Sequence, residues 1–275
     1  MLSSDGPEEM SGQKGAVLLT NEHKSSPYDA PELYDLLFES FDFDLPFWLK
    51  VARDAGGPVL EAGCGTGRVL LRLLEAGLDA DGFDVSGPMI ERFRAKARKK
   101  GWPSRVVEAD MREFSLPRRY ARVICAFNGF AHCETTEDQI RALRCFREHL
   151  EPGGALVLHI SYPGPKYWTE PDGVPTLEIE GKNPATGRVV QMWDTRTKDP
   201  VAQLQRSEVE IREIDKAGRT VASHRSVTSQ RWVYRYELEL LFRVAGFSRW
   251  TTWGGFEGKP LAGPQDQMIA WAWKD

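Results

Sequence analysis

The middle of the chain alternates short apolar runs with longer amphipathic stretches. Apolar runs bounded by glycine or acidic residues are typical of buried parallel strands, and apolar positions three or four residues apart are typical of helices. The pattern predicts strands near 58–62, 80–84, 104–108, 121–127 and 155–160. It predicts helices near 66–76, 87–100 and 136–150, and a break at 151–154 before the fifth strand. This alternation implies right-handed crossovers and a parallel sheet with a ligand at its carboxyl edge.

Beyond Pro163 the pattern changes to an alternation of apolar and polar positions. Residues 209–214 alternate one by one, and Asp215-Lys-Ala-Gly218 is a typical hairpin turn. After a loop at 163–171, we expect three or four antiparallel strands, from runs at 176–180, 188–197, 203–215 and 220–234. One face of this insertion should pack against the protein and the other should face water.

The two ends of the chain complete the predicted fold. Further elements are expected in helices at 31–38 and 43–55, a helix from Leu238 that stops at Gly246, and strands at 249–253 and 267–273. The predicted segments are a disordered polar tail at 1–26, the first part of the core at 27–162, the insertion at 163–231 and the completion of the core sheet at 232–275. The fold class is α/β: a doubly wound, seven-stranded, mostly parallel sheet with helices on both faces, plus an antiparallel β insertion after the fifth strand.

Composition narrows the class of protein. The 275 residues are 41% hydrophobic and 28% charged, which is ordinary for a globular protein with one well-buried domain. A net charge of -4 gives no general attraction to nucleic acid or membranes, so neither is an expected partner. The basic residues between Arg92 and Lys100 are interpreted as a solvated helix face. The apolar run Ala16–Leu19 is too short for a signal or a membrane span, and we expect a cytoplasmic protein.

Cysteine and histidine spacing does not suggest a metal site. Cys64, Cys125, Cys133 and Cys145 lack Cys-x-x-Cys spacing, and reduced thiols are the default in a cytoplasm. His132 lies beside Cys133 but has no further ligand close in sequence. We therefore expect no metal.

The clearest chemical signal is the glycine-rich turn after the first strand. Gly63, Gly65 and Gly67 let backbone amides approach a ligand, and Asp84 at the end of the second strand can accept both hydroxyls of a ribose. Glu61 precedes the turn, where the pyrophosphate of a dinucleotide would lie and would be repelled. Its carboxylate favours a ligand whose nearby group is positive. S-adenosylmethionine, with a sulfonium and an ammonium on an adenosine, meets this requirement.

Residues 59–162 resemble the core of class I S-adenosylmethionine-dependent methyltransferases of the small-molecule type. Glu61 and the three glycines match the family's first motif, and the acid of the second strand matches its ribose ligand. The resemblance implies that Met89 covers the adenine, that Asp110 accepts a hydrogen bond from its amino group and that the Met111 amide faces the ring. From the residues alone, Met89 is equally a core methionine and Asp110 a turn cap. The implied cofactor contacts are Tyr28, Glu61, Gly63, Gly65, Gly67, Asp84, Val85, Met89, Asp110, Met111 and Phe127.

The acceptor side is less defined. His132, just past the fourth strand, is the candidate catalytic residue, as a base or as a substrate-positioning group, with a structural hydrogen bond as the alternative. His159, among apolar neighbours, is interpreted as a core residue, and because it lies near the end of its strand it stays the second choice for the catalytic residue. N-terminal helices close over the cofactor in the resembling family, which makes Tyr28 and Tyr34 candidate lid residues; packing on an amphipathic helix explains them equally.

These features predict transfer of a methyl group from S-adenosylmethionine to nitrogen or oxygen of a small molecule by in-line displacement. The insertion resembles that of family members that methylate amino sugars or small amines, and in some of these it also builds a dimer, so a homodimer through the insertion is a further expectation. DNA-adenine methylation is disfavoured, because Phe127–Phe130 lacks the Asn/Asp-Pro-Pro-Tyr/Phe motif. A non-catalytic scaffold that binds adenosylmethionine and a nicotinamide-dependent oxidoreductase stay open as alternatives.

Overall fold

The first residues that the structure describes are tied to a distant strand. A computed structural model describes residues 25–103, 105–263 and 267–275. The predicted tail at 1–26 lies outside the described residues except for Ser25 and Ser26. Ser25 forms a bridge with Ser226, and the Ser26 side chain caps the short 3-10 helix η1 (Pro27–Asp29). Ser25 and Ser26, which the sequence assigns to the tail, are therefore part of the described fold.

The central sheet has seven strands. They are β1 (Val59–Ala62), β2 (Ala80–Asp84), β3 (Val106–Glu108), β4 (Tyr120–Cys125), β5 (Leu150–Ser161), β10 (Arg249–Gly254) and β11 (Gln267–Trp273). Their order is β10-β11-β5-β4-β1-β2-β3. Among these strands, β11 alone runs in the direction opposite to the other six. The prediction of a mostly parallel, doubly wound sheet is confirmed. The order reverses between β1 and β4, which is where such sheets bind ligands.

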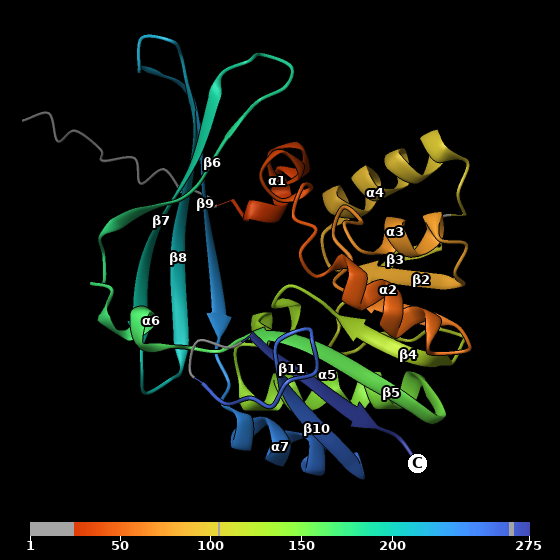
Figure 1. The fold of residues 1–275 in the computed structure, drawn as a ribbon. Coiled ribbons are helices and arrows are strands. Elements are labelled where there is room, and N and C mark those ends of the chain that lie inside the picture. The colour runs from red at the N-terminus through yellow and green to blue at the C-terminus, as the bar shows by residue number, and fades with distance from the viewer. Residues whose placement is uncertain (1–24, 104, 264–266) are drawn as a thin grey trace, which may run out of the picture.

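Helices cover both faces of this sheet (Figure 1). They are α2 (Leu45–Arg53), α3 (Leu70–Glu75) and α4 (Gly87–Lys100) on one face, and α5 (Thr136–His149) and α7 (Arg235–Val244) on the other. Strand β11 shows the two faces directly, because Met268 and Ala270 join the α5–α7 side of the core while Ile269 and Trp271 join the α2–α4 side. No helix of the described residues is both long enough and apolar enough to cross a bilayer.

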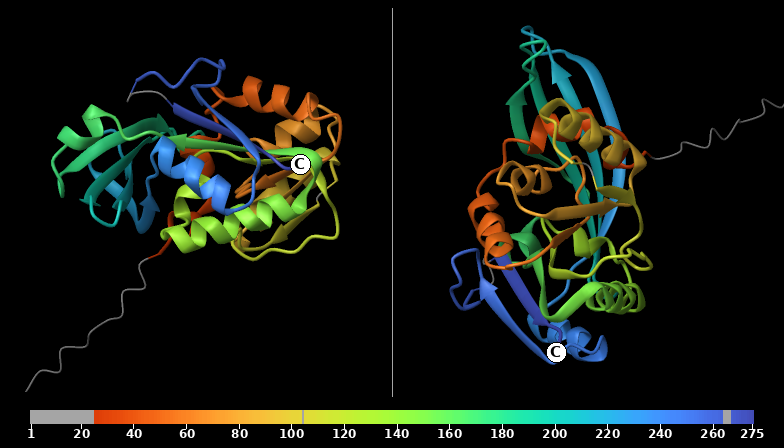
Figure 2. Two further views of the ribbon diagram at one scale, coloured as in Figure 1. Left: turned by 90° about the horizontal axis from the view of Figure 1, so that it is seen from below. Right: turned by 90° about the vertical axis from the view of Figure 1, so that its right-hand side faces the viewer.

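The insertion is a second, four-stranded sheet. Its strands are β6 (Pro175–Lys182), β7 (Val189–Asp199), β8 (Leu204–Ile214) and β9 (Thr220–Arg231). They are antiparallel in sequence order, and Asp215–Gly218 forms the predicted hairpin between β8 and β9. Figure 2 shows the far ends of these strands projecting beyond the core. The insertion thus forms one wall of the molecule, opposite the carboxyl edge of the central sheet (Figure 1).

Helix α1 (Pro31–Phe38) fills the space between the two sheets. Leu37 is buried against Val190, Val209 and Ile211 of the insertion, while the other side of the helix contacts α4. The expectation that one face of the insertion packs against the protein is therefore correct, and α1 covers part of that face.

Three sequence expectations differ from the structure. The loop at 163–171 contains a short helix, α6 (Pro165–Thr169), and the predicted helix at 66–76 is shorter, as α3. The predicted break at 151–154 belongs to β5, because the Gly153 amide donates to the Lys274 carbonyl and Gly154 accepts from the Lys274 amide. A partner so distant in sequence leaves no local signal at the turn.

Candidate cofactor and acceptor site

The glycine turn lies between β1 and α3 and needs glycine at three positions. Gly63, Gly65 and Gly67 have φ angles of 69°, 54° and 92°, in the left-handed region that disfavours other residues. At Gly67 a Cβ atom would also lie 2.4 Å from the Phe93 ring of α4. The turn therefore brings its backbone close to both a ligand site and the neighbouring helix.

Asp84 holds this turn in place from the end of β2. One carboxylate oxygen accepts the Gly65 amide at 2.8 Å, and the other accepts the Ser86 amide at 2.9 Å. The Ser86 side chain caps α4 by accepting the Met89 amide. Burial raises the pKa of Asp84, and the two amides oppose that shift. The predicted ribose acid thus lies beside the glycine turn, with its orientation already set.

Glu61 is a buried carboxylate at the end of β1. Its side chain is 3% exposed, and its Oε2 atom has no hydrogen-bond partner within the described part of the chain. Burial raises its pKa to about 8, although the positive charge of Arg68 acts in the opposite direction. A buried acceptor without a donor is costly unless a ligand supplies one. The ammonium group of S-adenosylmethionine is a donor of the right charge, so the residues present fit this cofactor.

The predicted adenine contacts lie along β2, α4 and the segment after β3. Val85 is 66% exposed beside Asp84, whereas Met89 is only 1% exposed at the start of α4. Both carboxylate oxygens of Asp110 accept hydrogen bonds from the Arg112 side chain, which lowers the Asp110 pKa. Met111 packs partly buried against the core. Arg112 is a competitor for Asp110 that the sequence prediction did not include.

Tyr28 connects the N-terminal segment to both halves of the site. Its backbone carbonyl accepts a hydrogen bond from the Ser86 hydroxyl at 3.0 Å, beside Asp84. Its phenol lies 2.8 Å from His132 Nε2 on the acceptor side. The Tyr34 ring lies 6.1 Å from the Tyr28 ring, and burial raises the pKa of Tyr34 to about 12. Both candidate lid tyrosines therefore lie at the site.

Asp35 of α1 is a site residue that sequence reasoning missed. Its buried carboxylate accepts from the Thr66 hydroxyl in the glycine turn at 2.6 Å, from Lys96 at 2.6 Å and from Arg92 at 2.7 Å. The interpretation of the α4 basic residues as a purely solvated face is thus wrong for Arg92 and Lys96. An acid on a predicted amphipathic helix is the one signal that could have suggested a partner.

Phe127 lies in the turn after β4, between the cofactor and acceptor sides. Its ring packs edge-on against Phe38 and Phe41, and the Arg68 guanidinium lies 4.9 Å from its centre. Arg68 in turn makes a two-pronged ion pair with the buried carboxylate of Asp44, with N–O distances of 2.5 and 2.8 Å. Arg68, which stands where a dinucleotide fingerprint has its third glycine, thus links the glycine turn to Phe127.

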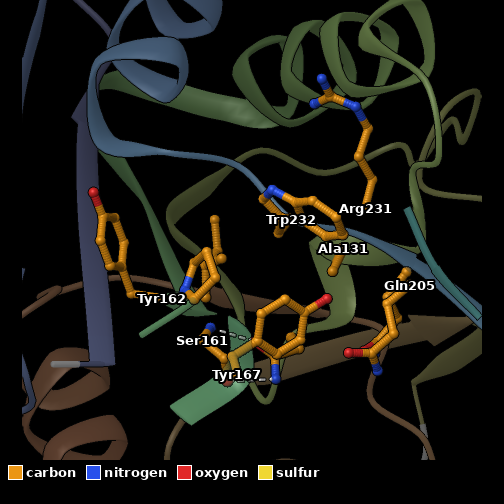
Figure 3. A pocket seen from close by; sticks show the side chains of 11 residues that line it. Ala131, Ser161, Tyr162, Tyr167, Gln205, Arg231 and Trp232 are labelled. Atoms are coloured by element: carbon orange, nitrogen blue, oxygen red, sulfur yellow. Dashed lines mark hydrogen bonds between the residues drawn. The ribbon is translucent and has the colours of Figure 1, made fainter. Parts of the chain in front are cut away.

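A cavity opens between the carboxyl ends of β4 and β5 and the inner face of the insertion (Figure 3). It has about 490 Å³ of empty space that is open to solvent. The aromatic residues among its lining are Tyr162, Tyr167 and Trp232, and its amides are Asn128, Gln205 and Gln230. The Trp232 ring is also packed against Trp168 at 5.2 Å. Trp232 therefore lines the cavity and also packs against a second tryptophan.

Arg231 contributes little charge to this cavity. Its guanidinium points away toward α5, as Figure 3 shows, and donates to Gln139, Gln203 and Glu237. Of the described lining residues it is the one with a charged side chain. The cavity wall is therefore aromatic and neutral-polar.

His132 lies at the edge of the cavity without lining it. It follows β4 in the 3-10 helix η2 (Gly129–His132), and its Nε2 atom is 3.4 Å from the amide nitrogen of Gln230, which does line the cavity. Burial lowers the pKa of His132, and a backbone hydrogen bond to Ser229 opposes that shift. An imidazole of this kind is neutral at pH 7. In the described residues no group of three or more His, Cys, Asp and Glu side chains could hold a metal ion.

Comparison with known proteins gives matches in sequence and structure. The family model of a methyltransferase domain matches residues 59–154. Cypemycin N-terminal methyltransferase of a Streptomyces species is 28% identical over 249 residues, which are 89% of this chain and 96% of that protein. The dTDP-3-amino-3,6-dideoxy-alpha-D-glucopyranose N,N-dimethyltransferase of Streptomyces fradiae is 25% identical over 84% of this chain and 88% of its own.

Solved structures match over nearly the whole chain. The CcbJ methyltransferase of Streptomyces caelestis superposes with a TM-score of 0.73 at 25% identity, covering 90% of this chain and 98% of its own. Several other curated relatives match over only 43% to 56% of their own length. The matched domain contains Glu61, the glycine turn and Asp84. The chain is an S-adenosylmethionine-dependent methyltransferase, and residues 59–154 match the methyltransferase domain.

Proposed function

We propose that this methyltransferase transfers its methyl group to the amine nitrogen of a small molecule held in the cavity at the carboxyl edge of β4 and β5. The observation that carries the proposal is the aromatic, neutral wall formed by Tyr162, Tyr167 and Trp232. Aromatic faces attract a cationic amine, while a wall without free charge does not hold it in the protonated form. The two long relatives described above act on amino groups according to their names, which supports nitrogen over oxygen.

The cofactor supplies an electrophilic methyl group on a sulfonium, so the protein mainly has to align and desolvate the reactants. Glu61 and the glycine turn would hold the amino-acid end, and Asp84 the ribose. Val85, Met89 and Met111 would surround the adenine. Asp110 would accept a hydrogen bond from the adenine amino group on an oxygen that it shares with Arg112. Tyr28 and Phe127 would close the two sides of the site.

An amine attacks only after it has lost its proton. His132 is neutral and its Nε2 atom lies at the cavity edge, which supports a role as the proton acceptor once an amine takes the place of the Tyr28 hydroxyl at Nε2. In a purely positioning role, His132 would only hold Tyr28. Because the phenol of Tyr28 hydrogen-bonds to the imidazole in the described structure, Tyr28→Phe and His132→Gln separate the two roles.

If His132 is the base, His132→Gln lowers kcat about 100-fold and removes the rise of kcat with pH, whereas Tyr28→Phe retains that rise. If His132 only holds the lid, both variants raise the KM for S-adenosylmethionine and leave the pH profile unchanged. Equal kcat and an unchanged profile in His132→Gln would remove the base assignment.

The test of the acceptor class is a product screen by mass spectrometry. The protein is incubated with S-adenosylmethionine and a panel of 3-amino-3-deoxyglucose, a tripeptide with a free amino terminus, glycine and matched phenols. We expect products that carry one or two added methyl groups on amines only. Tyr167→Leu should raise the KM of the accepted amine about tenfold, while the exposed Tyr236→Leu serves as a matched control. Methylated phenols with unmodified amines would overturn the assignment to nitrogen.

We also propose that the protein forms a homodimer through the insertion. Strand β6 is an edge strand, and seven of its eight residues are exposed. Exposed edges can pair with a second copy across a two-fold axis. Light scattering after gel filtration should give twice the monomer mass. Glu178→Pro should lower the measured mass to that of the monomer.

The site of action that we propose is the cytoplasm. The support is that Cys64, Cys125, Cys133 and Cys145 are free thiols, and three of them are buried. Fractionation of cells that express a tagged chain tests this location.

A further inference from the structure

The turn after β4 is strained at two successive residues. Phe127 and Asn128 have φ angles of 50° and 63°, which residues other than glycine rarely adopt. The strain falls mainly on Phe127, because asparagine tolerates the left-handed region better than bulky residues such as phenylalanine do. Such strain persists only where surrounding contacts enforce it, and it gathers at functional sites.

The turn follows the end of β4, next to the end of β1. Glu61 and Ile124 are neighbours in the sheet, so the ends of β1 and β4 lie side by side. Phe127 packs under Arg68 near the cofactor side, and Asn128 lines the acceptor cavity. The turn therefore lies between methyl donor and methyl acceptor.

His159 of the neighbouring strand β5 accepts two hydrogen bonds from the turn. Its Nδ1 atom accepts the Phe127 amide at 3.2 Å, and its backbone carbonyl accepts the Asn128 amide at 3.3 Å. Because Nδ1 accepts, the ring proton is on Nε2, which donates to the side-chain oxygen of Gln267 at 2.6 Å. Both ring nitrogens are thus used, and the ring lies edge-on to Phe256 at 5.0 Å.

Asn128 is fixed from the other side by Ser161. The Asn128 side-chain oxygen accepts the Ser161 amide at 2.5 Å, and its nitrogen donates to the Ser161 hydroxyl at 2.8 Å. Ser161 also lines the acceptor cavity. One connected set of hydrogen bonds thus runs from Gln267 on β11 to the surface that meets the acceptor.

We propose that His159 is a positioning residue for methyl transfer: by accepting the Phe127 amide it holds the strained Phe127–Asn128 turn that aligns cofactor and acceptor. This role goes beyond the proposed acceptor class and holds for any acceptor in the cavity. His159 is 2% exposed, and both of its ring nitrogens are occupied, so it neither touches the acceptor nor exchanges a proton with it. The charged groups nearest to it are Asp44 and Arg68, which pair with each other.

Two substitutions separate this role from simple packing. His159→Asn retains an acceptor at the position of Nδ1 and loses the bond to Gln267. His159→Gln retains a donor at the position of Nε2 and loses the acceptor for the Phe127 amide. We expect kcat to fall about 100-fold in His159→Gln and less than tenfold in His159→Asn, because small misplacements of the reacting atoms are costly. The KM for S-adenosylmethionine should change less than threefold in both.

Two further measurements need no acceptor. Amide hydrogen exchange by NMR should show fast exchange at Phe127 in His159→Gln and slow exchange in His159→Asn. Calorimetric titration with S-adenosylhomocysteine should give binding in both, which shows that they are folded. Equal kcat and equal Phe127 protection in the two variants would overturn the proposal, as would a larger loss in His159→Asn.

The experiments give a different set of results if the proposed acceptor class is wrong. If no amine of the panel is methylated by the wild-type protein, the exchange and calorimetric results still decide whether His159 holds the turn. If an amine is methylated and His159→Gln is as active as the wild type, the positioning role fails while the acceptor class stands.

Discussion

At the scale of single residues, the site combines groups that are poorly satisfied without a ligand. Among the described residues, the buried Glu61 has a side-chain oxygen with no hydrogen-bond partner, and Phe127 has a left-handed backbone conformation. Each feature costs stability in the free protein. Glu61 and Asp84 could be predicted, because their chemistry follows from their places beside a glycine turn. Arg92 and Lys96 could not be placed, because their partner Asp35 is separated from them by more than one helix in sequence.

The first prediction concerns the protonation of Glu61. The pKa of Glu61 is about 8 in the folded protein and 4.5 in its ordinary state. Its contribution to the free energy of unfolding is therefore fully present below pH 4.5 and is lost as the pH rises through 8. The free wild-type protein should therefore lose stability between about pH 4.5 and pH 8, and this group should cause no further loss above pH 8. Glu61→Gln should be more stable than the wild type at pH 9 and show a flatter profile, measured by urea unfolding.

The same substitution should weaken cofactor binding. The cofactor ammonium loses a buried anionic partner, which we expect to lower affinity for S-adenosylhomocysteine about 100-fold in calorimetric titration. Wild-type binding at pH 7 should release a proton, detected as a dependence of the binding heat on the buffer. The exposed Glu75→Gln on α3 is the control and should change neither property. A variant with unchanged affinity would place the ammonium elsewhere.

At the scale of elements, local patterns predicted the core strands to within a few residues. The buried run at 80–84 and the helical spacing at 87–100 are local signals, and β2 and α4 are found where expected. Helix α6 and the early start of β5 were missed because proline and glycine in 151–154 and 163–171 suggested loops. Pairing with the far end of the chain overrides that local preference.

The second prediction concerns the attachment of α1. Asp35 joins this helix to Thr66 and to two cations of α4, and its side chain is buried. Asp35→Asn should lower the free energy of unfolding by about 3 kcal/mol, because the cations lose a buried partner. The dissociation rate of S-adenosylhomocysteine should rise with it, since α1 lies over the glycine turn.

The control for α1 lies on the same helix. Glu32 is exposed and 3.6 Å from Arg92, so Glu32→Gln should change stability by less than about 0.5 kcal/mol. If both variants have equal stability and equal dissociation rates in stopped-flow measurements, Asp35 does not anchor the helix.

At the scale of the whole molecule, the acceptor cavity depends on how the insertion is joined to the core. The pattern of apolar and polar positions predicted both sheets, whereas their junction involves contacts between residues far apart in sequence. Arg231, at the end of β9, donates to Gln139 on α5 and to Glu237 on α7, at 2.8 and 2.6 Å. No periodicity or motif marks it, because its partners come from separate segments. The cavity thus has a rigid support that only the structure reveals.

The last prediction follows from this junction. Arg231 is buried, so Arg231→Met leaves the Glu237 carboxylate without its charged partner and should cost about 3 kcal/mol or more. Because Arg231 joins the insertion to α5 and α7 of the core, the loss should be local. Amide exchange should accelerate in β7–β9, while β1, β2 and β4 stay protected and S-adenosylhomocysteine still binds. The exposed Arg225→Met in the same strand is the control and should leave exchange unchanged. Uniform acceleration in both sheets would instead mean that they unfold as one unit, and that the insertion cannot move independently to admit an acceptor.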